Sequence, residues 1–249
     1  MISVTVDGTQ VEVEEGATIL TAAKQAGRWV PTLCFDERQA PFGACRVCMV
    51  AVEGAPKPLP GCTTPCRDGM VISTEDPTAR RVAVAVVELV LSELPQAPAA
   101  HTELAQVAGR LSVTGEPRWP GPVHEVEHDY RHPYLAFEHE LCISCGRCVR
   151  ACDEVQGAFA LTATGRGFGA NVTAGLNAGF NDSTCVSCGA CADTCPTDAI
   201  TEITLLDGVI APPTAAKPWG RRRKERHDPT ENQGTTPGGR PHPSKELGR

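Results

Sequence analysis

The chain has 249 residues, a formal net charge of −7, 41% hydrophobic residues and only 4% aromatic residues. This length suits roughly two or three small domains, and the scarcity of large rings speaks against one ordinary enzyme core. The charge is uneven, because the segment from residue 212 carries nine Lys and Arg against four Asp and Glu, and the body is acidic. An acidic body speaks against nucleic-acid binding and suits protein partners with positive docking faces.

Thirteen cysteines are the most informative feature of the composition. The first residues have the pattern of a strand and not of a signal peptide, and the most apolar run, residues 82–91, is too short to span a membrane. We therefore expect a cytoplasmic protein without a transmembrane segment. In that compartment cysteines more often bind metal than form disulfides, and an odd count excludes complete internal pairing.

The first unit opens with two alternating segments, residues 2–7 and 10–14, around an Asp-Gly pair, which predicts a β-hairpin. Residues 17–26 then carry apolar side chains at helical spacing before a glycine, which predicts a helix. A second pair of strands is expected over residues 47–53 and 70–74. Together these elements predict a small α+β sheet with the helix packed across one face.

Four cysteines with the spacing C-x10-C-x2-C-x13-C lie in the loops of this unit: Cys34, Cys45, Cys48 and Cys62. A leading cysteine, a close pair and a distal fourth are the ingredients of a plant-type [2Fe–2S] site, but the gaps differ from the usual form. Zinc therefore stays an alternative on spacing alone. The order of strand, strand and helix, as in ferredoxin-like β-grasp folds, favours the [2Fe–2S] cluster.

Cys66 is the cysteine left over from this set. We interpret it as a free and partly buried thiol, with a substitute ligand or a redox-reactive thiol as the alternatives.

Residues 77–94 are predicted to form one helix, with Asp76 as its N-cap and Pro77 in its first position. Residues 95–134 are rich in Pro, Gly and His and contain no cysteine, which indicates a linker. Within them, residues 124–128 satisfy H-E-x-x-H, a zinc-binding pattern when it lies on a helix. Because prolines flank this pattern closely, a solvated linker is the preferred interpretation.

Eight further cysteines form two matched runs about 43 residues apart, each with the spacing C-x2-C-x2-C-x3-C. The second run ends in Cys195-Pro196, as in bacterial two-cluster ferredoxins, where the fourth cysteine of each run binds the other cluster. Zinc sites prefer paired C-x2-C motifs and are disfavoured. The spacing therefore assigns one [4Fe–4S] cluster to Cys142, Cys145, Cys148 and Cys195, and the second to Cys152, Cys185, Cys188 and Cys191.

Two smaller patterns receive plain structural interpretations. Residues 165–169, GRGFG, lack the full spacing and the βαβ setting of a nucleotide-binding loop and are predicted to form a turn. Residues 212–249 are expected to be a disordered basic tail. Their RRRK run at 221–224 could bind an anionic surface, nucleic acid or an acidic patch of a partner, but a solvated tail is the default.

The cysteine-rich segments resemble the N-terminal iron–sulfur region of NAD-dependent formate dehydrogenase α subunits. The resemblance is carried by CGRCVRACDEVQGAFAL at 145–161, GRGF at 165–168, CVSCGAC at 185–191, GATILTAAK at 16–24 and PTLC at 31–34. That region is related to the large iron–sulfur subunit of respiratory complex I and to the diaphorase iron–sulfur subunit of NAD-reducing hydrogenases. The resemblance covers roughly residues 1–205.

One departure from this family concerns a further cluster. Family members carry an H-x3-C-x2-C-x5-C motif between the two halves, for a [4Fe–4S] cluster with one histidine ligand. In this sequence the matching positions are His101, Ala105, Ala108 and Thr114. Since these side chains supply no thiolate, we expect this cluster to be absent.

The predicted fold class is α+β in four parts. These are a [2Fe–2S] ferredoxin-like β-grasp domain at 1–76, a helical linker with the degenerate histidine-and-cysteine cluster region at 77–134, a two-[4Fe–4S] ferredoxin-like domain at 135–211, and the disordered basic tail at 212–249.

The resemblance implies an iron–sulfur electron-transfer subunit of a multi-subunit NAD(H)-dependent oxidoreductase, with the formate dehydrogenase type preferred. Such a subunit would relay single electrons between a flavin- and NAD-binding subunit and a separate molybdopterin catalytic subunit, without a substrate site of its own. The alternatives are a diaphorase subunit of an NAD-reducing hydrogenase and a free ferredoxin-like carrier. A zinc-stabilised regulator with a nucleic-acid-binding tail is a third alternative, although no nucleic-acid partner is expected.

Overall fold

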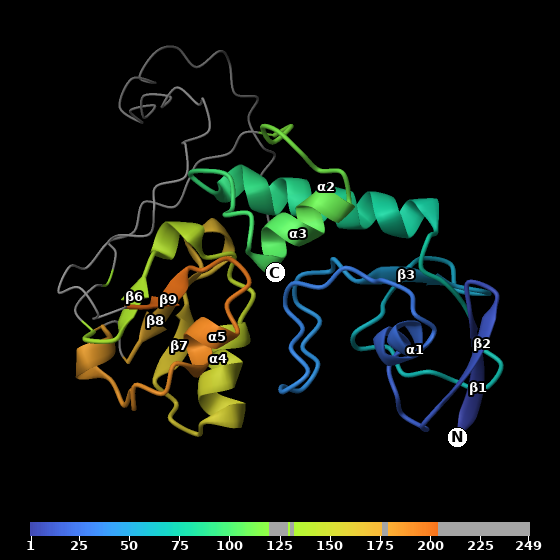
Figure 1. The fold of residues 1–249 in the computed structure, drawn as a ribbon, viewed down its shortest axis with the longest axis horizontal. Coiled ribbons are helices and arrows are strands. Elements are labelled where there is room, and N and C mark those ends of the chain that lie inside the picture. The colour runs from blue at the N-terminus through green and yellow to red at the C-terminus, as the bar shows by residue number, and fades with distance from the viewer. Residues whose placement is uncertain (120–128, 130–131, 176–178, 204–249) are drawn as a thin grey trace, which may run out of the picture. The chain divides into compact units, whose positions relative to one another are not determined.

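The computed structural model describes residues 1–119, 129, 132–175 and 179–203 of the chain. Its first part is a five-stranded sheet in the order β2-β1-β5-β3-β4 (Figure 1). Strands β1 (Ile2–Val6) and β2 (Thr9–Val13) form the predicted antiparallel hairpin, with Ile2 opposite Val13. Asp7 and Gly8 both have positive φ in its turn, which suits the right-handed twist of the two strands.

The centre of the sheet joins segments that are distant in the sequence. Strand β5 (Val71–Ser73) pairs in parallel with β1 and antiparallel with β3 (Met49–Val52), which confirms the second predicted strand pair. The two-residue strand β4 (Leu59–Pro60) pairs with β3 and was not predicted.

Helix α1 (Ile19–Gln25) covers the first sheet as expected. It begins after Thr18, whose hydroxyl accepts a hydrogen bond from the N–H of Thr21 at 3.3 Å. Its buried residues pack with Val4, Val6 and Ile72 of the sheet, and Cys48 and Cys62 belong to the same core. Two of the predicted metal ligands are therefore part of the apolar interior that holds this unit together.

Two helices follow, and Figure 1 shows them lying next to each other. Helix α2 (Pro77–Glu93) is confirmed with its predicted cap, since Asp76 accepts hydrogen bonds from the N–H groups of Thr78 and Ala79. Helix α3 (Glu103–Arg110) was not predicted and begins after Thr102, whose hydroxyl accepts from Ala105. Among the described residues, no helix is long and apolar enough to cross a membrane.

The two helices share a core with the cysteine loops. Leu104, Val107 and Leu111 of the α3 region pack with buried residues of α2, and Leu33 and Val47 belong to the same cluster. Leu33 precedes Cys34 and Val47 precedes Cys48. The N–H of Leu104 also bonds the carbonyl of Pro196, next to Cys195. The linker helices therefore support loops from both cysteine-rich parts.

The last part contains two small antiparallel ribbons. Strand β6 (Leu135–Phe137) pairs with β9 (Ile200–Glu202), and β7 (Leu161–Thr164) pairs with β8 (Asn171–Ala174). The turn between β7 and β8 contains a 3₁₀ segment, Gly167–Gly169, which confirms the predicted turn at 165–169. The remaining short helical segments are η1 (His139–Leu141), α4 (Arg147–Arg150), η2 (Ala151–Val155), η4 (Phe180–Asp182) and α5 (Ala190–Asp193).

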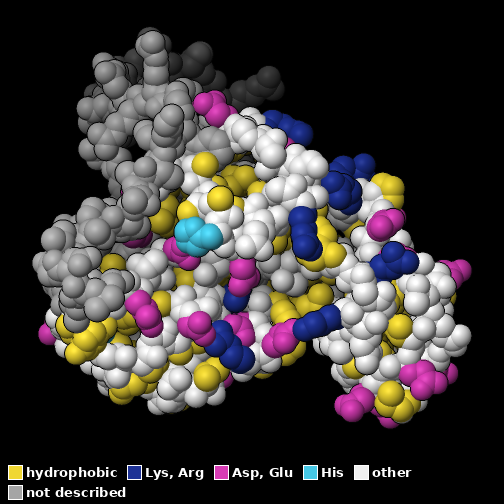
Figure 2. Space-filling view, viewed as in Figure 1, with side chains coloured by type: hydrophobic (Ala, Val, Ile, Leu, Met, Phe, Trp, Pro, Cys, Tyr) yellow, Lys and Arg dark blue, Asp and Glu magenta, His cyan; other side chains and the backbone are white. Residues whose placement is uncertain are grey.

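The surface combines both signs of charge. Figure 2 shows acidic and basic side chains interspersed over one face, with apolar side chains between them. The sequence patterns on 124–128 and 212–249 lie outside the described residues.

We predict that Leu104→Ala lowers the free energy of unfolding by about 2–5 kcal/mol, because Leu104 is 0% exposed and the lost side chain leaves a cavity. The matched control is Leu89→Ala on α2, where Leu89 is 51% exposed and a change within about 0.5 kcal/mol is expected. Anaerobic thermal unfolding followed by circular dichroism measures both. Equal effects of the two variants would contradict the packing described for α3.

Candidate metal centres

The four N-terminal cysteines meet in one place. Hydrogen bonds join the thiols of Cys45 and Cys62 to Cys34, and a further thiol contact joins Cys62 to Cys48. Cys34, Cys48 and Cys62 are buried, and Cys45 is partly buried. The structure thus brings together all four residues that the sequence singled out here.

Local backbone geometry makes this gathering possible. Cys48 lies just before β3 and Cys62 just after β4, so the pairing of these strands sets the two thiols side by side. A Cβ on Gly61 would lie 3.2 Å from the carbonyl oxygen of Cys48, so the close approach favours glycine. The N–H of Cys45 donates to Cys34 Sγ at 3.4 Å.

The N-terminal site favours a thiolate at Cys34. Hydrogen bonds from the Cys45 and Cys62 thiols lower the pKa of Cys34 to about 2, and a hydrogen bond from Cys62 lowers the pKa of Cys48 to about 7. The same contacts raise the pKa of Cys45 and Cys62. Since the thiolate is the metal-binding form of cysteine, the site is chemically suited to a thiophilic metal group.

Cys66 differs from these four cysteines in its surroundings. It is 6% exposed within the core under the sheet, and its N–H bonds the carbonyl of Ala17 at 2.8 Å. Burial raises the pKa of its thiol. The structure thus agrees with a free thiol, but this thiol is buried where a partly buried one was expected.

The eight C-terminal cysteines surround two hollows. One hollow is lined by Cys142, Cys145, Cys148 and Cys195 together with apolar side chains. The other is lined by Cys152, Cys185, Cys188 and Cys191. In each case the fourth cysteine comes from the other run, which is the grouping that the ferredoxin spacing predicts.

The two runs adopt the same loop conformation. Gly146 and Gly189 both have left-handed backbone geometry, with φ of 75° and 76°. Ser144 and Ser187, at φ of 51° and 56°, each donate an N–H to the preceding cysteine sulfur at 3.4 Å. These turns point backbone N–H groups at sulfur, as a negatively charged metal–sulfur group requires.

Burial opposes thiolate charge around both hollows. Burial raises the pKa of Cys142 to about 11 and the pKa of Cys145 and Cys191 to about 12. Cationic metal must therefore offset the charge when these residues act as thiolates.

The eight C-terminal cysteines suit multi-iron groups. Within the part of the chain that the structure describes, no three His, Cys, Asp or Glu side chains gather as tightly as one metal ion requires. The eight cysteines instead surround two central spaces. Four thiolates spread around a space fit a cluster of several irons, whereas zinc draws four sulfurs to about 2.3 Å from one centre.

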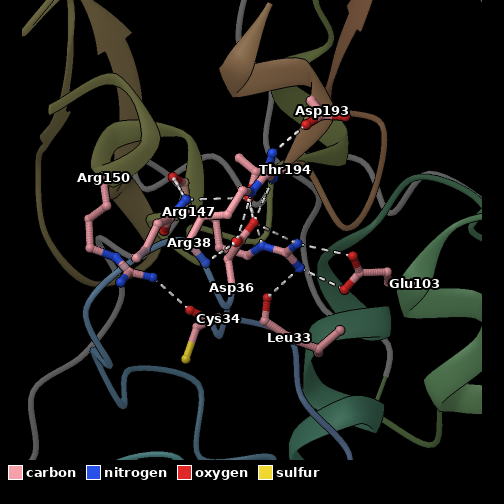
Figure 3. Close-up of polar contacts among 10 residues, drawn as sticks. Leu33, Cys34, Asp36, Arg38, Glu103, Arg147, Arg150, Asp193 and Thr194 are labelled. Atoms are coloured by element: carbon pink, nitrogen blue, oxygen red, sulfur yellow. Dashed lines mark hydrogen bonds and ion pairs between the residues drawn. The ribbon is translucent and has the colours of Figure 1, made fainter. Parts of the chain in front are cut away.

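A buried polar junction connects the first and second groups of cysteines (Figure 3). Its centre is Arg147, which lies between Cys145 and Cys148 and is 4% exposed. The guanidinium bonds both carboxylate oxygens of Glu103 at 2.6 and 3.0 Å and the hydroxyl of Thr194 at 3.0 Å. It therefore ties the cysteine loop of α4 to helix α3 and to the residue before Cys195.

The same guanidinium reaches the loop that carries Cys34. It lies 3.5 Å from Asp36 Oδ2 and donates to the carbonyl of Leu33 at 3.4 Å. The Thr194 hydroxyl also donates to Asp36 Oδ2 at 2.6 Å. Asp36 is 8% exposed, and hydrogen bonds from Arg38 and Thr194 hold the pKa of its carboxyl well below the usual range.

Arg150 strengthens this junction from the next turn of α4. Its guanidinium donates to the carbonyl of Cys34 at 2.7 Å and also bonds the carbonyl of Ala40. The N–H of Ala40 in turn bonds Glu154 at 2.8 Å. A backbone atom of one candidate ligand is thus held directly by the helix that carries the next cysteine group.

Sequence reasoning did not identify the junction or His132, a buried residue near Cys185. Arg147 lies in the motif at 145–161, but the sequence analysis gave it no role. The sequence offered one signal for Arg147, because it places a charged side chain in a cysteine loop where small residues are expected. Its partners Glu103 and Leu33, 44 and 114 positions away, gave no signal in the sequence.

The positions of the degenerate motif lie in and beside α3 and differ in their surroundings. His101 is exposed and bonds Asp198, while Ala108 is buried in the core between α2 and α3. Ala105 is partly buried and Thr114 is exposed.

Comparison with known protein families agrees with this geometry. Residues 1–77 match a 2Fe-2S iron-sulfur cluster binding domain, and residues 126–199 match a 4Fe-4S dicluster domain. The chain therefore combines one domain of the two-iron type with one domain of the two-cluster, four-iron type.

Several curated proteins are similar over most of this chain. It is 34% identical over 212 residues to the NADP-reducing hydrogenase subunit HndD of Solidesulfovibrio fructosivorans, covering 81% of this chain and 36% of that protein. It is 35% identical over 211 residues to the NADH-ubiquinone oxidoreductase 75 kDa subunit of Reclinomonas americana, covering 81% and 29%. The chain thus spans about a third of the length of these relatives.

A solved structure is similar in fold. A chain in the crystal structure of an NAD⁺-reducing [NiFe]-hydrogenase in the H₂-reduced state matches with a TM-score of 0.74 and 26% identity. The match covers 81% of this chain and 87% of that chain.

We predict that Arg147→Met lowers the free energy of unfolding by about 1–3 kcal/mol, because it removes the donor to the buried Thr194 hydroxyl and to the Leu33 carbonyl, while Asp36 keeps its ion pair with Arg38. Arg118→Met is the matched control. Arg118 has a side chain 66% exposed in a surface pair with Glu88, so its loss should cost about 1 kcal/mol or less. Anaerobic chemical unfolding followed by fluorescence and by cluster absorbance measures both. A junction variant as stable as the control would contradict the role given to Arg147.

Proposed function

We propose that this chain is an iron–sulfur electron-transfer subunit of a multi-subunit NAD(H)-dependent oxidoreductase. The observation that carries the proposal is the grouping of twelve cysteines into three sets of four, with the first two sets joined by a buried polar junction. Similarity to subunits of NADH-ubiquinone oxidoreductase and of NAD(P)-reducing hydrogenases supports it.

The ligand assignment follows the three groups. We propose that Cys34, Cys45, Cys48 and Cys62 hold a [2Fe–2S] cluster, that Cys142, Cys145, Cys148 and Cys195 hold a first [4Fe–4S] cluster, and that Cys152, Cys185, Cys188 and Cys191 hold a second. When bound, such clusters take up and release single electrons at potentials set by burial and by hydrogen bonds to sulfur.

The residues of this chain have three tasks in that role. Arg147 and Arg150 fix the loop of Cys34 against the loops of the first [4Fe–4S] set, so that the separation of the two sites is constant. Backbone N–H groups of Cys45, Ser144, Ala160 and Ser187 donate to cysteine sulfurs and offset their charge. Apolar walls such as Phe137 and Phe180 exclude water.

For the partners, we propose a flavin- and NAD-binding subunit and a molybdopterin catalytic subunit of formate dehydrogenase type, on the motif resemblance at 145–161 and 185–191. A diaphorase subunit of a hydrogenase is the second candidate. It is favoured by the fold similarity to a chain of the NAD⁺-reducing [NiFe]-hydrogenase, 87% of which is matched. The degenerate positions at His101, Ala105, Ala108 and Thr114 are proposed to hold no cluster in either case.

Iron counting in paired variants tests the ligand assignment. We expect about ten irons per chain in the native protein, from one two-iron and two four-iron clusters. Cys142→Ala/Cys195→Ala removes two ligands of one cluster and should leave about six irons. Cys185→Ala/Cys195→Ala removes a ligand from each of two clusters and should leave about two.

The control for these variants is Cys66→Ala, which should keep about ten irons because Cys66 is outside all three groups. The reverse result for the two double variants would show that each run holds its own cluster. Zinc without acid-labile sulfide in the native protein would overturn the proposed function itself.

Anaerobic purification of the tagged chain from its source cell tests the partners. Co-elution with FMN and molybdenum is expected for the formate dehydrogenase type, and nickel in place of molybdenum would select the hydrogenase type. An isolated chain that exchanges electrons with several enzymes, without a stable flavoprotein partner, would overturn the assignment as a subunit in favour of a free carrier.

A further inference from the structure

His132 is a buried side chain beside the second [4Fe–4S] set that belongs to no cysteine motif. It is 4% exposed and lies just before β6. Its ring packs edge-on against Phe180, with centroids 5.5 Å apart, and against Tyr134 at 6.0 Å. These contacts hold the imidazole in one orientation.

Hydrogen bonding fixes which ring nitrogen carries the proton. The N–H groups of Tyr134 and Leu135 both donate to Nδ1 of His132, at 3.1 and 3.0 Å. Nδ1 must therefore be the unprotonated, accepting nitrogen. In a neutral imidazole the single N–H then lies on Nε2, so the ring has one donor, on its far side.

That donor faces the loop of Cys185. Nε2 lies 3.7 Å from Cys185 Sγ and 3.2 Å from the hydroxyl oxygen of Ser187. Hydrogen bonds to a charged acceptor are stronger than those to a neutral one. A thiolate at Cys185 would therefore be a stronger acceptor for the Nε2–H hydrogen bond than the neutral hydroxyl of Ser187.

The duplicated run provides an internal comparison. Cys142 and Cys185 occupy equivalent positions, and each accepts a serine N–H at 3.4 Å. In the described residues, the hydrogen-bond donors that reach Cys142 come from Ser144. The imidazole at Cys185 is an addition to an otherwise repeated geometry.

We propose that His132 is a positioning residue that raises the reduction potential of the second [4Fe–4S] cluster. It does so by donating a hydrogen bond from Nε2–H to Cys185 Sγ. The inference rests on the ligand assignment proposed above. A donor to a ligand sulfur stabilises the more negative, reduced state more than the oxidised state. His132 thereby distinguishes the two [4Fe–4S] sites, whose loops are alike.

Three substitutions at His132 distinguish the accepting role of Nδ1 from the donating role of Nε2. His132→Asn keeps an acceptor near the position of Nδ1, for Tyr134 and Leu135, but has no donor that reaches Cys185. His132→Gln places an amide donor near the position of Nε2. His132→Leu removes both functions and reports the cost of losing the ring.

The experiment is an anaerobic redox titration of the full chain followed by electron paramagnetic resonance, with iron counted in every sample. Cys195→Ala is the background, because it leaves the second site as the only complete [4Fe–4S] site. In His132→Asn we expect the potential of that cluster to fall by about 59 mV, a tenfold change in its oxidised-to-reduced ratio for a one-electron couple. His132→Gln should recover most of the shift, and the [2Fe–2S] potential should not move.

The outcomes are distinct. An unchanged potential in His132→Asn with full iron content would overturn the proposal, as would an equal shift of the [2Fe–2S] cluster. Loss of this cluster in all three variants would show that His132 only holds the loop, and this too would overturn the tuning role. If the ligand assignment fails instead, the paired variants described above will show it, because Cys142→Ala/Cys195→Ala will then hold about two irons and not about six.

Discussion

The buried guanidinium of Arg147 is the interaction on which the arrangement of the cysteine groups depends. A charge so far from water is tolerated only when it is paired and hydrogen-bonded, and here Glu103, Asp36, Thr194 and a backbone carbonyl surround it. The planar guanidinium of arginine can donate hydrogen bonds to several acceptors in fixed directions, which the ammonium group of lysine cannot do. One side chain therefore joins an N-terminal loop, a linker helix and both runs of the C-terminal domain.

This junction gives the linker a structural purpose. Helices α2 and α3 bury an apolar core that reaches Leu33 and Val47, the residues before two N-terminal cysteines, while Glu103 at the start of α3 pairs with Arg147. The core excludes water beside the junction and strengthens its electrostatic contacts. The segment predicted as a helical linker thus supports cysteine loops from both domains.

The C-terminal domain shows how a duplication can acquire unequal halves. Its two cysteine loops share backbone angles, glycine positions and N–H-to-sulfur contacts. The side chains packed around them differ, with Arg147 beside Cys145 and His132 beside Cys185. Two similar sites can in this way have different electrostatic surroundings without any change in their cysteines.

The sequence by itself determined the elements whose signals are local. The hairpin at Asp7 and Gly8, the cap of α2 at Asp76 and the grouping of cysteines by spacing each depend on residues a few positions apart or on a repeated motif. Only the tertiary structure revealed α3, Arg147 as the centre of a junction, and His132 as a donor toward Cys185. The polar contacts among these features join residues 44 to 158 positions apart. A buried polar contact between such distant residues produces no periodicity or spacing in the sequence, so it could not be predicted from the sequence.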